Sequence, residues 1–73
     1  MTLRPFKNWE RFLDYIRSGT QRVYFSPGAG TQPKRARVQA LDVDGDRIEA
    51  HSLSESFETT IVGRSELWRF TRP

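Results

Sequence analysis

Polar and apolar residues alternate along the middle of the chain, from Arg35 to Ala50 (RARVQALDVDGDRIEA). Side chains of a β-strand point in turn to its two faces, so this period of two predicts a strand. The first arm divides into two sets, with Arg35, Arg37 and Gln39 on one face and Ala36, Val38 and Ala40 on the other. Asp44-Gly45 is a strong hairpin-turn signal. We therefore predict a hairpin with strands over about 34–43 and 46–51.

The N-terminal part of the chain has a different period. Its apolar residues follow the i, i+3, i+4, i+7 spacing of one helical stripe, namely Trp9, Phe12, Leu13 and Ile16. Asn8 suits the N-cap, and Gly19 suits the position just after the last turn. The pattern predicts a helix over about 7–18. Because so short a helix is marginal alone in water, its aromatic stripe should pack on another element.

The remaining segments are short and β-rich. We predict further strands over about 21–25, 57–62 and 67–70, a Pro/Gly-rich loop at 26–33, and a tight turn at 63–66 that is compatible with 3₁₀ geometry. A helix followed by five short strands predicts one α+β domain over residues 1–73. Its expected architecture is an N-terminal helix capping a five-stranded antiparallel, SH3-like (Sm-like) small barrel.

A chain of 73 residues can bury one small core and no more. The expected core combines the helical stripe with the apolar residues of the strands: Trp9, Phe12, Leu13, Ile16, Val23, Phe25, Val38, Ile48, Phe57, Ile61, Leu67, Trp68 and Phe70.

The composition limits the types of site and the cellular compartment that we expect. The absence of cysteine excludes disulfides and thiolate metal sites and fits a reducing compartment. The first ten residues lack the apolar run of a signal peptide, and no stretch resembles a membrane span. We expect a cytoplasmic protein without membrane attachment.

The net charge of +3 conceals an uneven distribution. Residues 1–37 hold eight basic and two acidic side chains, whereas residues 38–73 hold four basic and seven acidic ones. No acid occurs between Asp14 and Asp42, and ten of the twelve basic residues are arginine. A guanidinium group suits phosphates, carboxylates and flat rings, so the acid-free segment predicts a surface for an anionic partner.

If the strands at 21–25 and 34–43 pair, their polar residues share one surface. The candidate nucleic-acid-binding residues are Arg22, Tyr24, Lys34, Arg35, Arg37 and Gln39. The arginines would contact phosphates, Lys34 would add diffuse charge, Tyr24 would stack on a base, and Gln39 could bond a base edge. In the alternative, Tyr24 packs on its neighbours and the arginines pair with the acids of the second half.

Other patterns resemble reactive sites only superficially. Asp42, Asp44 and Asp46 surround Gly45, but a calcium loop needs its glycine at the sixth position and a glutamate at the twelfth. His51 is the single histidine, and nothing in the sequence supplies an orienting aspartate or a held nucleophile. We predict no catalytic residue, no metal site and no cofactor.

Several segments carry a family resemblance. They are Arg35-Ala36-Arg37-Val38-Gln39-Ala40, Gly45 with Ile48-Glu49-Ala50, Phe57, and Gly63-Arg64. In this order the run from Arg22 to Leu67 resembles WYL-type domains, although Arg47-Ile48-Glu49 replaces the signature tripeptide and Ala40 replaces the usual proline. The resemblance implies contact with nucleic acid or nucleotides, as in bacterial regulators and helicases.

Two functions follow as hypotheses. The first is a noncatalytic module that contacts nucleic acid, single-stranded or without sequence preference, through the arginine-rich strand face. The second is a protein-interaction or assembly module, binding a protein partner or a second copy of itself. It would use an edge strand or the aromatic patch formed by Trp68 and Phe70 with Trp9 and Phe12.

Overall fold

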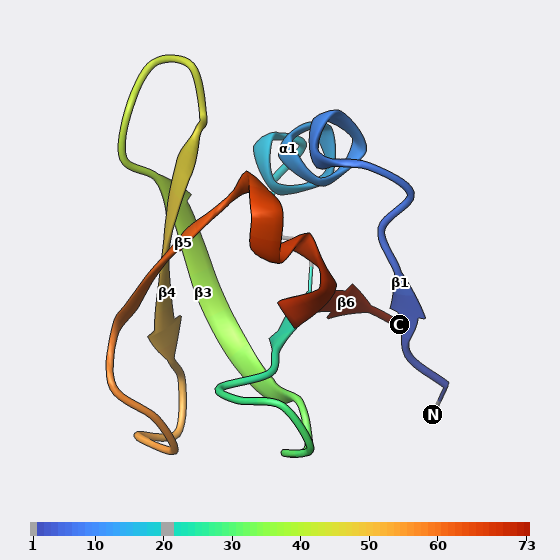
Figure 1. Cartoon of the computed structure of the whole chain (residues 1–73), viewed down its shortest axis with the longest axis vertical. Helices are drawn as coiled ribbons and strands as arrows, with labels where there is room; N and C mark the ends of the chain where they lie inside the picture. The colour runs from blue at the N-terminus through green and yellow to red at the C-terminus, as the bar shows by residue number, and fades with distance from the viewer. Residues whose placement is uncertain (1, 20–21) are drawn as a thin grey trace.

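The computed structural model describes residues 2–19 and 22–73 and has an α+β architecture, with one helix and a six-stranded antiparallel sheet (Figure 1). The strand order is β1-β6-β2-β3-β4-β5. The elements in chain order are β1 (Arg4–Pro5), α1 (Trp9–Arg17), β2 (Val23–Phe25), β3 (Lys34–Ala40), β4 (Arg47–Ser52), β5 (Thr60–Gly63), the 3₁₀ helix η1 (Arg64–Arg69) and β6 (Phe70–Arg72).

The sheet differs from the predicted five-stranded barrel in two ways. It has a sixth strand, β1, in which Arg4 lies opposite Arg72 and Pro5 opposite Thr71. A two-residue strand that contains proline gives no alternating pattern, and proline is tolerated there because the strand is an edge. The sheet also stays open, with β1 and β5 as its two edges, so the prediction of a closed barrel is not confirmed.

Three strands begin or end three residues away from the predicted position. The strand predicted over 34–43 ends at Ala40, because the N–H groups of Gly45 and Asp46 bond to Asp42 and form the loop. The strand predicted over 57–62 begins at Thr60. The last strand is 70–72 instead of 67–70, since the 3₁₀ turn predicted at 63–66 continues to Arg69. Gln21, in the strand predicted over 21–25, lies outside the described residues.

The predicted helix is confirmed, and so are its predicted N-cap, Asn8, and the position of Gly19 just after its last turn. The Oδ1 atom of Asn8 accepts a hydrogen bond from the backbone N–H of Arg11 at 2.9 Å, which is N-cap geometry. Gly19 follows the C-cap Ser18 with φ +118°, a left-handed conformation that glycine adopts without steric cost. The helix spans Trp9–Arg17, slightly less than the predicted 7–18.

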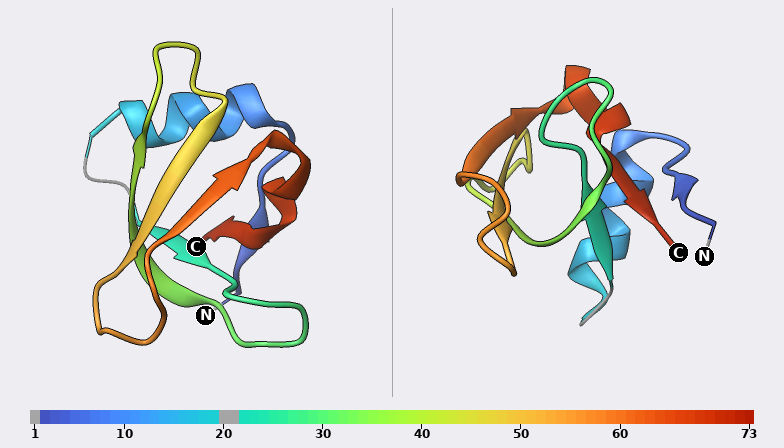
Figure 2. Two further views of the ribbon diagram at one scale, coloured as in Figure 1. Left: turned by 60° about the vertical axis from the view of Figure 1, so that its left-hand side comes forward. Right: turned by 90° about the horizontal axis from the view of Figure 1, so that it is seen from below.

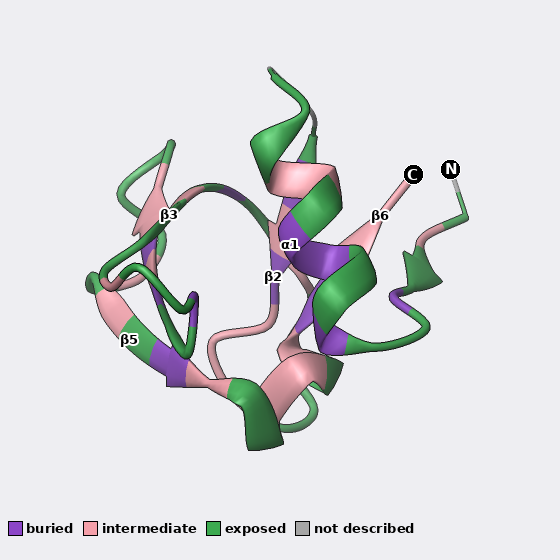
Figure 3. Ribbon diagram, turned by 90° about the horizontal axis from the view of Figure 1, so that it is seen from above, coloured by how far each residue is buried: buried purple, intermediate pink, exposed green. Residues whose placement is uncertain are grey.

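The core is built around stacked aromatic rings. The Phe12 ring of α1 lies 4.4 Å from the Phe70 ring of β6, centroid to centroid, and Phe70 lies 5.3 Å from Phe25 of β2. All three side chains are fully buried. Figure 3 shows the buried residues of α1 on the side that faces β2. The aromatic stripe of the helix therefore packs on the sheet, as the sequence predicted.

The predicted core is correct for most positions and wrong for two. Ile61 is 57% exposed and Trp68 is 55% exposed. Ile61 lies on the outward side of β5, opposite Glu49, and Trp68 lies on the 3₁₀ turn instead of on a strand. The sequence analysis also missed four buried residues, namely Phe6, Ala36, Ala50 and Val62.

Arg69 holds the start of the loop between β2 and β3. Its guanidinium carbon lies 4.6 Å from the centre of the Phe25 ring. Its Nε donates a hydrogen bond to the carbonyl of Ser26 at 3.0 Å, and its Nη2 donates to the carbonyl of Pro27. The side chain also pairs with Glu66, so this arginine acts within the structure.

The tip of the β3–β4 hairpin packs against α1, and the left view of Figure 2 shows the hairpin crossing in front of this helix. The indole Nε1 of Trp9 donates a buried hydrogen bond of 2.6 Å to the carbonyl of Gly45. Gly45 has φ +71°, and a Cβ atom there would lie 2.8 Å from Leu13 Cδ1. The hairpin can approach the helix this closely because residue 45 has no side chain.

We expect Gly45→Ala to lower the free energy of unfolding by about 1–3 kcal/mol, because alanine is strained at this φ and its methyl group collides with Leu13. Urea unfolding followed by tryptophan fluorescence measures the change. Gly28→Ala is the matched control, because its Cβ would meet only Thr31 Cγ2 at 4.0 Å. Equal effects at the two positions would contradict this account.

Candidate nucleic-acid interface

Four of the six predicted binding residues lie on the outward face of β2 and β3. Val23 and Phe25 are buried, so Tyr24 between them faces the other way, and it pairs across the ladder with Arg35. Arg35, Arg37 and Gln39 are exposed and alternate with the inward-facing Ala36 and Val38. We call Tyr24, Arg35, Arg37 and Gln39 the basic strand face.

The other two candidates lie beside this face. Lys34 pairs with the buried Phe25, so alternation places it on the face opposite Arg35, exposed at the end of β3. Arg22 is exposed and lies one residue before β2, and its carbonyl accepts a hydrogen bond of 2.8 Å from the Tyr15 hydroxyl. Arg22 and Lys34 can therefore add charge at the margins of the face only.

Strand β4 contributes neighbours that the sequence analysis missed. His51 lies opposite Arg37, and Glu49 lies opposite Gln39. The carboxylate of Glu49 accepts a 3.4 Å hydrogen bond from the Gln39 amide and contacts His51 Nε2. His51 Nδ1 lies 3.2 Å from Thr59 Oγ1. The Gln39 amide group is thus already engaged by the protein.

These neighbours depend on the register of the hairpin, that is, on which residues of β3 and β4 lie opposite each other. A two-residue turn at Asp44-Gly45 would place Gln39 opposite Ala50, whereas the longer loop places it opposite Glu49. A shift of one residue moves every side chain of a strand to the other face. The position of the turn alone therefore could not predict that the Glu49 carboxylate lies next to Gln39 on the basic strand face.

Two shallow hollows meet beside this face. One cleft, of about 320 Å³, lies between the C-terminal end of α1 and β3, and its lining residues are Ile16, Gly19, Val23, Arg35, Ala36, Arg37, Val38 and Leu53. A neighbouring hollow of about 440 Å³ is lined by Arg37, Gln39, His51, Ser52 and Leu53. Arg37 and Leu53 line both, so the two hollows meet at these side chains.

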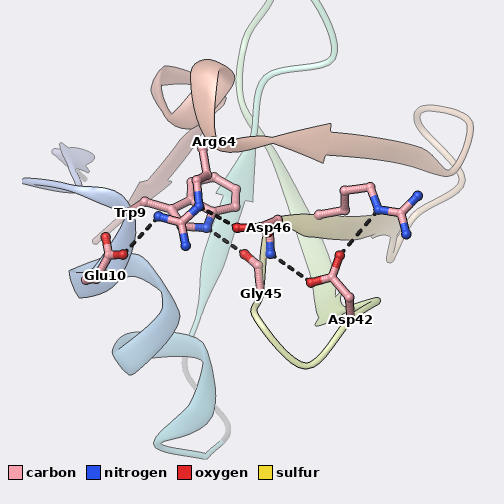
Figure 4. A network of polar contacts seen from close by, with 7 residues as sticks. Trp9, Glu10, Asp42, Gly45, Asp46 and Arg64 are labelled. Carbon is pink, nitrogen blue, oxygen red and sulfur yellow. Dashed lines mark hydrogen bonds and ion pairs between the residues drawn. The ribbon is translucent and has the colours of Figure 1, made fainter.

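Three acids of the second half, Asp42, Asp46 and Glu66, pair with arginines of the same half. Figure 4 shows the Arg64 guanidinium between Glu10 and Asp46, at 2.8 Å and 2.7 Å. Arg47 pairs with Asp42 at 3.3 Å, and Arg69 pairs with Glu66 at 3.0 Å. We call Arg64, Glu10 and Asp46 the tip clamp, because they join α1, the hairpin tip and η1.

The tip clamp shifts the titration of its partners. The hydrogen bond from Arg64 holds the pKa of Glu10 below its ordinary value of 4.5. Hydrogen bonds to the carboxylates of Glu10 and Asp46 raise the pKa of the Arg64 guanidinium, and the bond to Glu10 is the larger cause. At the base of the tip, the backbone N–H of Asp46 lowers the pKa of Asp42 below 3.8, and Arg47 adds to this effect.

By contrast, the basic residues of the acid-free segment pair with no acid among the residues that the structure describes. Within residues 2–19 and 22–73, the side chains of Arg17, Arg22, Lys34, Arg35 and Arg37 form no ion pair. The described residues therefore do not support the alternative in which acids of the second half neutralise these arginines. Two guanidinium groups of the basic strand face, those of Arg35 and Arg37, remain available to an outside anion.

The described residues hold no group of three or more histidine or acidic side chains placed to bind a metal ion. Over the same part of the chain, no helix has the length and apolar character needed to cross a membrane.

The chain matches no family model, no curated protein and no solved structure.

We expect the free energy of unfolding to fall as the pH drops through the lowered pKa values of Glu10 and Asp42. Between those values and the ordinary 4.5 and 3.8, the unfolded chain binds more protons than the folded one, so stability rises with pH. Urea midpoints measured from about pH 2 to about pH 6 follow this change.

The variant Arg64→Gln should flatten part of that acid dependence, because it removes the main cause of the shift at Glu10. Arg11→Gln is the matched control, since Arg11 is an exposed helical arginine without an ion pair among the described residues. An unchanged acid profile in Arg64→Gln would show that the tip clamp does not form in solution.

Proposed function

We propose that this domain is a noncatalytic nucleic-acid-binding module, selective for single strands or indifferent to sequence, that uses the basic strand face. Arg35 and Arg37 hold phosphates, and the ring of Tyr24 lies beside Arg35 where a base can stack. Arg22 and Lys34 add diffuse charge at the margins. Phosphate contacts of this kind bring affinity without sequence information.

The observation that carries the proposal is the separation of paired from unpaired cations. Arg47, Arg64 and Arg69 are paired with carboxylates, whereas Arg35 and Arg37 project from one strand face without such partners in the described chain. A cation that is not neutralised within the fold contributes its full charge to the outer field. Glu49, engaged by His51 and Gln39, is the acid nearest to this face along β4.

Two finer assignments belong to the same proposal. The helix, the curved antiparallel sheet and the 3₁₀ turn before the last strand support an SH3-like small barrel left open at β1 and β5. The resemblance to WYL-type domains supports a nucleic-acid or nucleotide partner. We further propose that the domain acts in the cytoplasm, in keeping with a chain without cysteine.

We expect binding to a fluorescent single-stranded oligonucleotide that weakens steeply with salt, with log affinity falling by about 0.7 per phosphate contact for each unit of log salt. The double variant Arg35→Glu, Arg37→Glu should lose most of the affinity and reduce the slope by about 1.4. Fluorescence anisotropy titrations at several salt concentrations measure both quantities.

The control for that experiment is Lys7→Glu with Arg11→Glu, which changes the net charge equally at exposed positions outside the basic strand face. It should retain most of the salt dependence. An equal loss in both double variants would indicate attraction by overall charge only, and no binding at low salt would end the proposal.

A specific observation also favours an assembly function. Trp68 and Ile61 are large apolar residues that are more than half exposed, and β5, which carries Ile61, is an open edge of the sheet. An unpaired strand edge can accept a strand from another chain. As a second proposal, the domain self-associates or binds a protein partner through this edge.

In that case, we expect light scattering to give a mass well above 8.5 kDa that does not depend on salt. Trp68→Ala should lower the mass, and the double variant Arg35→Glu, Arg37→Glu should leave it unchanged, because the two surfaces are distinct. A monomer at high protein concentration would argue against self-association.

A further inference from the structure

The cleft between α1 and β3 has an apolar floor directly beside the unpaired arginines. Its lining combines aliphatic residues of the helix and of the inward sides of β2 and β3 with two arginines that alternate with them along β3. The aliphatic residues are Ile16, Val23, Ala36 and Val38, and the arginines are Arg35 and Arg37. Its volume of about 320 Å³ falls in the range of small-ligand sites.

The cleft lies where the pairing between β2 and β3 ends. The β2–β3 ladder ends at Val23 opposite Ala36, whereas β3 continues to pair with β4 as far as Ala40. Beyond Ala36, the described chain places no strand against this side of β3. The cleft lies at this position, and Ile16 of α1 and Gly19 just after the helix contribute to its lining.

The backbone of β3 adds polar groups to this recess. The carbonyl of Arg35 accepts a bond from the N–H of Leu53, and the N–H of Leu41 donates to Arg47, so odd-numbered residues direct their backbone groups toward β4. In an antiparallel ladder, alternate residues point to opposite sides. The N–H and carbonyl groups of Val38, which lines the cleft, therefore point away from β4 and can bond the edge of a ligand.

These features together define the chemistry of the occupant. Aliphatic walls favour a flat, largely apolar ring, the backbone groups of Val38 offer in-plane hydrogen bonds, and the arginine rim favours an adjoining anion. We propose that the cleft receives one unstacked nucleobase of a single strand, while Arg35 and Arg37 hold the phosphates on either side of it. This inference rests on the proposed function and assigns it a specific base-binding site.

The charged residues that line the three hollows favour one place for the phosphates, beside Arg35 and Arg37. From the cleft, the adjoining hollow passes His51 and reaches a third one, of about 570 Å³, that is lined by Glu55 and Glu58 among others. Neither glutamate has an ion pair in the part of the chain that the structure describes. Phosphates are thus attracted to the hollow beside α1, which Arg35 and Arg37 line, and repelled from the third hollow, which Glu55 and Glu58 line.

The test compares an oligothymidylate with an abasic deoxyribose-phosphate strand of the same length, because the two carry the same charge. We expect the abasic strand to bind about 5- to 100-fold more weakly, as removal of one bound base implies. The salt slopes should be similar, since the phosphate contacts are retained. Anisotropy competition measures both strands under one set of conditions.

The variant Val38→Phe fills the cleft, and it should bring the affinities of the two strands together while leaving the salt slope in place. Leu53→Ala, at the exposed rim, should reduce the preference without risk to the core. Ile61→Ala is the control, an exposed aliphatic residue outside this cleft. Thermal unfolding establishes that each variant is folded.

The outcomes separate the two proposals. Equal, salt-dependent affinity of the wild-type protein for both strands would overturn the base site and leave the phosphate-binding function standing. A strand preference that survives in both Val38→Phe and Leu53→Ala would also overturn the site. No binding of either strand would remove the proposed function and the base site together.

Discussion

The stack of Phe12, Phe70 and Phe25 is the contact on which the remaining structure depends. These rings come from the helix, the last strand and the second strand, so one cluster joins the two ends of the chain to its middle. A nine-residue helix has little stability of its own in water, and burial against these rings supplies what it lacks. The stack also turns Phe25 inward, and alternation then turns Tyr24 outward beside Arg35.

The fold divides the charges of the chain into two populations. Arginines of the second half bind carboxylates, carbonyls and rings and so serve as structural parts, as Arg64 and Arg69 illustrate. The basic residues of the first half contribute little to the fold through their charges. Net charge alone does not express this division, because the sum of +3 combines a strongly basic first half with an acidic second half.

The sequence predicted the features that local physics determines. The helix with its Asn8 cap, the hairpin, and the outward direction of Arg35 and Arg37 follow from period, capping and alternation, and the structure has all of them. Features that depend on distant contacts were not predictable. Pro5 becomes part of a strand only because Thr71 lies beside it, and Trp68 is exposed only because η1 extends to Arg69.

The same limit applies to the candidate site. Alternation along one strand placed Arg35, Arg37 and Gln39 on a common face, but the neighbours across the ladder depend on a register that one residue of loop length can change. Glu49 and His51 therefore came from the structure, as did the recess beside Val38. Pairing of Arg64 with Glu10, 54 positions away, has no signature in the sequence.

Arg69 also determines where this domain could accept new sequence. Its hydrogen bonds fix Ser26 and Pro27, whereas the following Gly28–Thr31 turn closes on itself through bonds between its own first and last residues. A foreign peptide spliced between Ala29 and Gly30 would interrupt that local turn and leave the anchor below it intact. The loop is therefore a natural insertion point for an epitope or a fluorescent label, on a scaffold whose helix and sheet need no adjustment.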